Sequence, residues 1–218
     1  MNLYTHYVLA ARLASQIQLE NQAEYAWGAI VPDIRYLAGL PRSQTHLPKE
    51  KIQALADRYP HLRPFLQGYR VHCALDEIDL TRTVGRAFPI QLVSQVLRKK
   101  LTSQHLAVLV ELYYLRTAQI KGEISGAANE VLAGMGISSQ HARDFADVAR
   151  AYLESPSMDT AMSAFQRLGF AEDTRVEKYM AAFRSMQRNA LLLNMLLLGV
   201  KNARLEQQAE VRSIISLS

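Results

Sequence analysis

The chain has 218 residues, of which 49% are hydrophobic, and it carries a formal net charge of +5. This composition excludes intrinsic disorder and provides enough apolar residues for one substantial core. The seven prolines and ten glycines are scattered, so no linker marks a boundary, and we predict a single domain over residues 1–218. The single cysteine, Cys73, excludes an intramolecular disulfide framework and suits a reducing compartment.

Apolar residues recur at intervals of three or four along almost the whole chain, and sustained alternation with a period of two is absent. This pattern predicts an all-α protein, built as a bundle of many helices. In chain order, we expect a helix at 3–20, a short helix that Asn21 caps and Pro32 ends, a loop with one helical turn at 33–47, and further helices at 48–59, 64–83, 89–100, 103–121, 123–135, 138–154, 158–168, 173–199 and after 201. Ser103 and Ser138 stand where N-caps are expected, and Gly122 and Gly136 where left-handed C-terminal caps are expected.

The chain shows no signal for secretion or for a membrane span. Its N-terminus has no basic region followed by a continuous apolar run. The longest apolar stretch, 190–200, is interrupted by Asn194 and falls well short of the roughly 20 residues that cross a bilayer. We therefore expect a cytoplasmic protein without stable membrane insertion. The sequence leaves its oligomeric state open.

The positive charge is concentrated in one part of the chain. Between Arg35 and Lys100 there are 12 Lys or Arg and 5 Asp or Glu, whereas the two signs balance from Leu101 onward. A field of this sign favours anionic ligands such as phosphate esters, nucleic acid or an anionic membrane surface. A solvated basic surface explains the same excess equally well.

The first predicted helix places a histidine among apolar residues. Leu3, His6, Ala10, Leu13 and Ile17 are three or four residues apart and therefore share one helical face. His6 should consequently point into the protein. A histidine in such a position is more often a hydrogen-bonded core residue than a metal ligand, so both roles stay open for His6 on spacing alone.

A later helix carries a stronger chemical signal. Phe65, Tyr69, His72 and Asp76 follow one another at helical steps along one stripe. A buried aspartate needs a cation, a metal or several hydrogen bonds, because removing its charge from water costs several kcal/mol. Imidazole and carboxylate form a suitable donor set for zinc. The alternatives are a simple ion pair between His72 and Asp76, or an exposed pair on a helix that faces water.

Two further candidate ligands lie in the predicted loop. Asp33 directly follows Pro32, and His46 precedes Pro48 by two residues, so both side chains stand near stiff backbone. Each also has an ordinary explanation, since Asp33 can cap a turn and His46 can face solvent.

Taken in order, these elements resemble the zinc-dependent phospholipase C family. They are His6 in the first helix, Gly-x-x-x-Pro-Asp at 28–33, Thr-His at 45–46, and His-x-x-x-Asp at 72–76. That family is all-helical, is similar in fold to S1/P1-type nucleases, and cleaves phosphodiester bonds with three zinc ions. The resemblance covers about the first 80 residues. On this view residues 1–83 carry the ligand motifs and residues 84–218 complete the bundle.

The resemblance implies one complete zinc site and part of a second. Asp33, His46, His72 and Asp76 would form the four-ligand site, and His6 with a bridging Asp76 would contribute to the other. Secreted members of the family also bind metal through an N-terminal tryptophan and through a downstream His, His, Glu cluster. This chain begins with Met1, and the histidines after Asp76 are only His105 and His141. It therefore resembles a reduced version of the family.

Together these observations predict a zinc-dependent hydrolase of phosphoric esters, similar to a phospholipase C-like phosphodiesterase. The expected substrate is a small phosphate ester or a phospholipid head group. Asp33 is the expected catalytic residue, because a carboxylate oxygen that is not bound to metal can orient or deprotonate the attacking water. The alternative is a non-catalytic, metal-containing helical protein that binds a partner or nucleic acid. Arg35, Arg42, Arg70 and Arg82 are candidates for holding a phosphate group.

Overall fold

In the computed structural model, residues 3–16, 19–87, 103–118, 120, 122–168, 181 and 190–205 are described, and among them there are helices and loops but no β-strand. The predicted all-α class is confirmed. The α-helices are α1 (Leu3–Ala14), α2 (Gln22–Ile30), α3 (Arg35–Ala38), α4 (Arg42–Thr45), α5 (Lys49–Arg58), α6 (Arg63–Glu77), α7 (Leu80–Ala87), α9 (Ser103–Thr117), α10 (Glu130–Gly134), α11 (Ser139–Glu154), α12 (Met158–Arg167) and α14 (Ala190–Ala203). Two 3₁₀ turns, η1 (Val31–Ile34) and η2 (Pro60–Leu62), lie between them.

Two helix starts that were predicted from capping residues, at Asn21 and Ser138, are confirmed, whereas Ser103 is itself the first residue of α9. The Asn21 side chain accepts a hydrogen bond from the backbone N–H of Glu24 at 3.1 Å, which satisfies a free donor at the start of α2. The Ser138 hydroxyl accepts one from the backbone of His141 at the start of α11. Gly136 has the expected left-handed conformation, with φ of 79°. Gly122, in contrast, does not cap the predicted helix, because α9 ends at Thr117, five residues earlier.

Several predicted helices are shorter in the structure. Helix α1 ends at Ala14 rather than at residue 20, and the Ser15 hydroxyl donates to the Arg12 carbonyl at its end. The helix expected at 64–83 is divided into α6 and α7 by the extended backbone of Ile78, whose ψ is 117°. The predicted loop at 33–47 contains η1, α3 and α4, which is more helical than the single turn expected. The helix expected at 89–100, most of the one at 173–199 and residues 206–218 lie outside the described residues.

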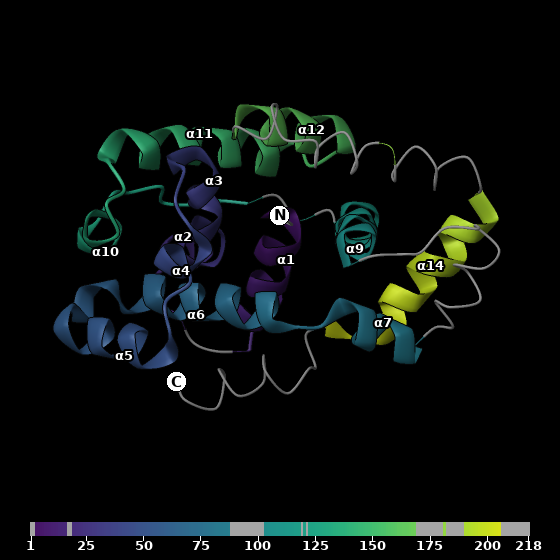
Figure 1. Ribbon diagram of the computed structural model, residues 1–218, viewed down its shortest axis with the longest axis horizontal. Helices are drawn as coiled ribbons and strands as arrows, with labels where there is room; N and C mark the ends of the chain where they lie inside the picture. Colours follow the sequence, from purple (N-terminus) through teal and green to yellow (C-terminus); the bar gives the residue numbers. More distant parts are fainter. Residues whose placement is uncertain are drawn as a thin grey trace.

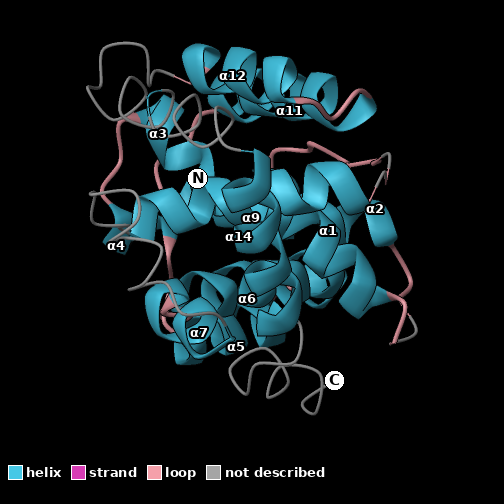
Figure 2. Ribbon diagram, turned by 90° about the vertical axis from the view of Figure 1, so that its right-hand side faces the viewer, coloured by secondary structure: helices cyan, strands magenta, loops and turns pink. Residues whose placement is uncertain are grey.

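The helices are arranged around α1. Figure 1 shows α11 and α12 along one side, α5 and α6 along the other, and α1 between them. Helices α7, α9 and α14 contact one another at one end of the molecule. Figure 2, turned by 90°, keeps α11 and α12 above α6 and α7. One connected hydrophobic core includes side chains from both predicted segments, such as Val8 from the first and Phe145 from the second.

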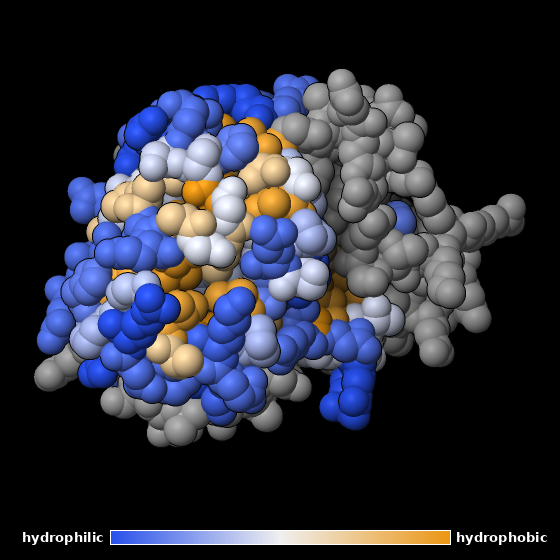
Figure 3. Space-filling view, turned by 60° about the vertical axis from the view of Figure 1, so that its left-hand side comes forward, coloured by the Kyte–Doolittle hydropathy of each residue, from blue (hydrophilic) through white to orange (hydrophobic). Residues whose placement is uncertain are grey.

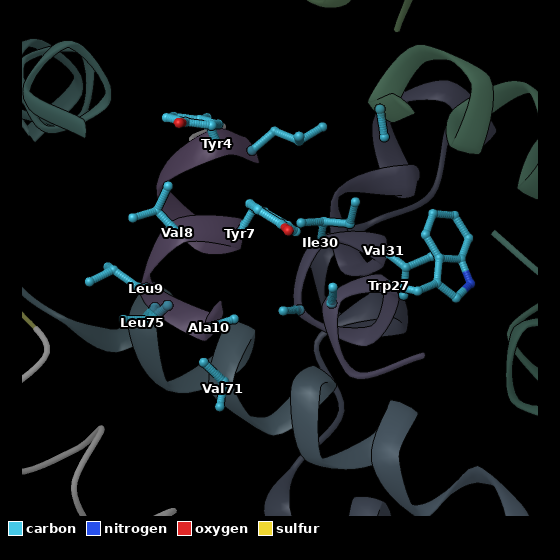
Figure 4. Packing of buried hydrophobic residues seen from close by; sticks show 14 of the residues in the cluster. Tyr4, Tyr7, Val8, Leu9, Ala10, Trp27, Ile30, Val31, Val71 and Leu75 are labelled. Carbon is cyan, nitrogen blue, oxygen red and sulfur yellow. The ribbon is translucent and has the colours of Figure 1, made fainter. Parts of the chain in front are cut away.

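The core contains many apolar side chains from the helices that carry the candidate ligands. Figure 4 shows Tyr7 and Ala10 of α1 beside Ile30 of α2, with Val71 of α6 reaching towards them. All four residues are buried. Because α1, α2 and α6 share this packing, the residues that they carry on their inner faces are held in fixed relative positions.

Helices α2 and α6 cross at two glycines. A Cβ atom on Gly28 would lie 1.9 Å from the carbonyl oxygen of Phe65, and one on Gly68 would lie 1.9 Å from the carbonyl oxygen of Tyr25. Only glycine permits backbones to approach this closely. The crossing brings the end of α2, and the turn that carries Asp33, directly against α6.

The face seen in Figure 3 mixes hydrophilic residues with smaller apolar areas. Among the large hydrophobic side chains of the described residues, only Met195 and Leu198 of α14 are exposed. Within the same residues, no helix is long and apolar enough to cross a membrane.

Candidate metal centre

The structure brings all five predicted ligands into one cluster. His6 comes from α1, Asp33 from η1, and His72 and Asp76 from α6. His46 directly follows α4. Two sets of three have ligand atoms within 4.8 Å of one another, and they share His72: the first contains His6 and Asp33, and the second contains His46 and Asp76. The other described histidines belong to neither set.

The Asp76 carboxylate lies between the three histidines. Its Oδ1 atom is 3.2 Å from Nε2 of His6, and its Oδ2 atom is 2.9 Å from Nε2 of His46 and 3.8 Å from Nε2 of His72. The rings of His6 and His72 are stacked, with their centroids 4.1 Å apart. Three imidazole nitrogens from three segments of the chain therefore converge on one carboxylate.

Hydrogen bonding fixes which nitrogen of His72 faces the cluster. Its Nδ1 atom is 2.9 Å from the carbonyl oxygen of Ala29, and a carbonyl only accepts, so Nδ1 carries the proton. The Nε2 atom is then the unprotonated nitrogen, and it is buried without a hydrogen-bond partner. A histidine that donates from one nitrogen to a backbone carbonyl and presents the lone pair of the other has the usual arrangement of a metal ligand.

A similar contact supports His46. Its Nδ1 atom lies 3.3 Å from the Thr45 hydroxyl, and Thr45 is itself fully buried. Because a hydroxyl can accept the Nδ1 proton, this contact supports a tautomer in which Nε2 of His46 turns its lone pair to a metal in place of its hydrogen bond to Asp76. This contact gives a physical reason for the Thr-His pair in the sequence motif.

The second carboxylate, Asp33, is buried and its Oδ2 atom has no hydrogen-bond partner. Burial of an unpaired carboxylate oxygen is costly unless a cation compensates. Together, the unpaired atoms of Asp33 and His72 show that the donor set fits a divalent cation better than a simple ion pair does.

Burial and charge shift the pKa values of these groups in different directions. Burial lowers the pKa of His72 well below its usual value, so this imidazole is neutral. Burial also lowers the pKa of His6, but the hydrogen bond and charge of Asp76 outweigh it, and the net shift is upward. Burial raises the pKa of Asp33. For Asp76 burial acts in the same direction, but its hydrogen bonds with His46 and His6 prevail and hold its pKa far below the usual range.

Among the five candidate ligands Asp76 has the most exposed side chain, and its position defines the open side of the cluster. The histidine side chains are at most 8% exposed, whereas Asp76 is 22% exposed. At that side the guanidinium of Arg42 donates to Oδ2 of Asp76 at 2.6 Å. Arg42 is one of the four arginines predicted from the sequence to hold a phosphate group. Nothing in the sequence predicted its contact with Asp76. Arg35 instead stacks on Tyr36 and donates to its hydroxyl.

In comparisons with protein-family models, with curated proteins and with solved structures, nothing matches this chain. The assignment of ligands therefore rests on the geometry of the chain itself.

Proposed function

We propose that this protein is a zinc-dependent hydrolase of phosphoric esters, similar to the phospholipase C family. The observation that carries the proposal is the buried, unpaired Nε2 of His72, whose lone pair is directed at a cluster of two carboxylates and two further histidines. A simple ion pair between His72 and Asp76 does not explain this atom, because His72 is neutral and lies 3.8 Å from the carboxylate.

The donor set favours zinc. Two imidazoles and one or two carboxylates are typical of catalytic zinc sites, whereas magnesium and calcium prefer sites made only of oxygen ligands. We propose Asp33, His46, His72 and Asp76 as ligands of one ion. Since Nδ1 of His72 is hydrogen-bonded to Ala29, only its Nε2 atom can bind metal. One nitrogen binds one ion, so the two sets of three ligands that share His72 cannot both hold a metal through it. A second ion, held by His6 and a bridging Asp76, would have to bind without it.

Bound zinc would supply a Lewis acid that polarises a phosphoryl oxygen and acidifies water. The protein's own groups would do the rest. Asp33 has a carboxylate oxygen without a partner and a pKa raised by burial, so it is suited to accept a proton from the attacking water. The Ala29 carbonyl holds His72 in its ligand tautomer, and burial of the three histidines limits the access of bulk water to their rings.

We propose that the substrate is a small phosphate ester or a phospholipid head group. The basic excess between Arg35 and Lys100 favours such anions. We further propose a cytoplasmic location, with which the free thiol of Cys73 is compatible.

The experiment that tests this proposal measures metal and turnover in the same samples. Protein purified without chelator is analysed for zinc and assayed with bis(p-nitrophenyl) phosphate. We expect about one zinc ion per chain, and we expect His72→Ala to lose both zinc and turnover. His61→Ala is the matched control, because His61 is an exposed histidine outside the cluster. Less than about half an ion per chain, unchanged by added zinc, would show that the site does not bind zinc.

One observation favours a second candidate function, a metal-containing protein that binds a partner or nucleic acid without turnover. The histidines are almost completely buried, and Arg42 covers part of the open side. Such a site can hold a metal for stability alone. Zinc binding that depends on His72, together with no hydrolysis that depends on it, would support this function instead.

A further inference from the structure

Arg42 occupies a specific place in the cluster. Its Nη1 atom is 2.6 Å from Oδ2 of Asp76, the same oxygen that lies 2.9 Å from Nε2 of His46. This oxygen belongs to one of the two candidate ligand sets. A divalent cation at Asp76 would repel the guanidinium and compete with it for the same carboxylate. Metal binding therefore favours release of the Arg42 side chain from Asp76.

The backbone around Arg42 is held by hydrogen bonds, whereas its side chain lies half exposed at the surface. The Gln44 amide donates to the carbonyl of Met135, and the Tyr69 hydroxyl donates to the carbonyl of Thr45, so α4 is attached to α6 and to the segment after α10. The Arg42 side chain, in contrast, is 48% exposed and has Asp76 as its ion-pair partner. It can leave Asp76 by rotation about its own bonds and still remain at the open side of the cluster.

We propose that Arg42 binds the substrate's oxyanion, and this rests on the function proposed above. In the structure its guanidinium pairs with Asp76, and with zinc bound it would bind an oxygen of a phosphate group at the open side of the site. Guanidinium suits this role, because its planar array of donors matches two phosphate oxygens at once. Arg42 thus links occupancy of the metal site to affinity for the anion.

The proposal predicts different effects on the binding of zinc and on the binding of phosphate. Replacement of Arg42 by glutamine removes the cation that competes for Asp76, so zinc binding should be unchanged or tighter. Affinity for phosphate should fall about 10-fold to 100-fold, because a charge-assisted contact is lost. Arg42→Lys keeps the charge but loses the paired donors, so it should be intermediate.

Isothermal titration with inorganic phosphate tests this on zinc-loaded wild type, Arg42→Gln and Arg42→Lys. Arg167→Gln is the control, since Arg167 is an exposed arginine of α12 outside the cluster. Zinc content and thermal unfolding of each sample show that the variants are folded and loaded. We expect Arg42→Gln to bind phosphate more weakly than wild type does. Arg167→Gln should bind phosphate as wild type does.

Phosphate binding by Arg42→Gln that equals wild type, or no binding by zinc-loaded wild type, overturns the proposal. Loss of the proposed hydrolase function is seen separately, as absence of bis(p-nitrophenyl) phosphate turnover in samples that still bind phosphate through Arg42. If wild type retains no zinc, both proposals fail, and the metal analysis shows it.

Discussion

The crossing of α2 and α6 leads to a prediction about Gly68. A Cβ atom at this position would lie 1.9 Å from the carbonyl oxygen of Tyr25 and 2.9 Å from the backbone nitrogen of Ala29. Real Cβ atoms essentially never come closer than 3.0 Å to such atoms. Because both obstacles are backbone, no side chain can rotate away. In Gly68→Ala the two helices must therefore separate by about 1 Å.

The cost can be worked out from two opposing effects. Overpacking of a rigid contact costs about 1 to 3 kcal/mol, and a backbone obstacle belongs at the upper end. Alanine is more favourable than glycine within a helix by about 1 kcal/mol, which offsets part of this. We expect a net loss of about 2 kcal/mol in the free energy of unfolding.

The same separation should weaken metal binding. The hydrogen bond from Nδ1 of His72 to the Ala29 carbonyl spans the crossing at 2.9 Å. An added separation of about 1 Å would break it, and loss of such a supporting bond typically reduces metal affinity about 10-fold to 100-fold.

Urea unfolding and zinc titration measure the two effects. Gly134→Ala is a matched control, because a Cβ at this helical glycine of α10 meets nothing within 4 Å. That variant should be unchanged or more stable by up to about 1 kcal/mol. If Gly68→Ala is as stable as Gly134→Ala and binds zinc as wild type does, the close crossing does not support the site as described.

Further predictions concern Glu111, which is buried, and Cys73, which is partly buried. The Glu111 carboxylate accepts hydrogen bonds from the backbone of Tyr4 and Thr5 at the start of α1 and from the Tyr152 hydroxyl. We therefore expect Glu111→Gln to lower the free energy of unfolding, measured by urea titration, by about 1 to 3 kcal/mol. A change below about 0.5 kcal/mol would contradict this role. Burial, assisted by the charge of Asp76, raises the pKa of the Cys73 thiol to about 12. At pH 8, iodoacetamide should therefore alkylate the folded, metal-free protein at least about 100-fold more slowly than the unfolded chain, and equal rates would be inconsistent with the burial. Because the folded state favours the protonated thiol, this group's contribution to stability should be present below about pH 9 and lost as the pH rises towards 12.

Some local signals in the sequence predicted the structure correctly. Asn21 and Ser138 mark helix starts correctly because a cap acts on donors within three residues of itself. The helix predicted at 123–135 forms only in part, as α10, and is too long for the opposite reason. The segment before α10 is held by distant partners, since Trp27 donates from its indole to the carbonyl of Ala127 and Ser125 donates from its backbone to Ala23. Helical periodicity contains no information about such contacts.

The candidate ligands divide in the same way. His6, His72 and Asp76 could be predicted from helical spacing, because His6 and His72 are buried on their helices and Asp76 follows His72 by one turn at the edge of the buried face. Their meeting with Asp33 and His46 depends on tertiary packing, and only the family resemblance suggested it. The close crossing of α2 and α6 at Gly28 and Gly68 was not predicted from the sequence. A glycine inside the otherwise well-formed helix α6 is nevertheless a signal of close backbone approach, and it stands one turn before His72.

The charges of the cluster connect its parts. Two carboxylates, Asp33 and Asp76, balance a divalent cation, and neutral histidines add nothing to the sum. Arg42 then contributes one positive charge without a partner, at the side where the cluster meets solvent. An anion that binds there restores neutrality, whereas a neutral ligand does not. Arg42, which pairs with Asp76 in the structure, should therefore make a zinc-loaded site selective for an oxyanion, which is the chemical class of a phosphate ester.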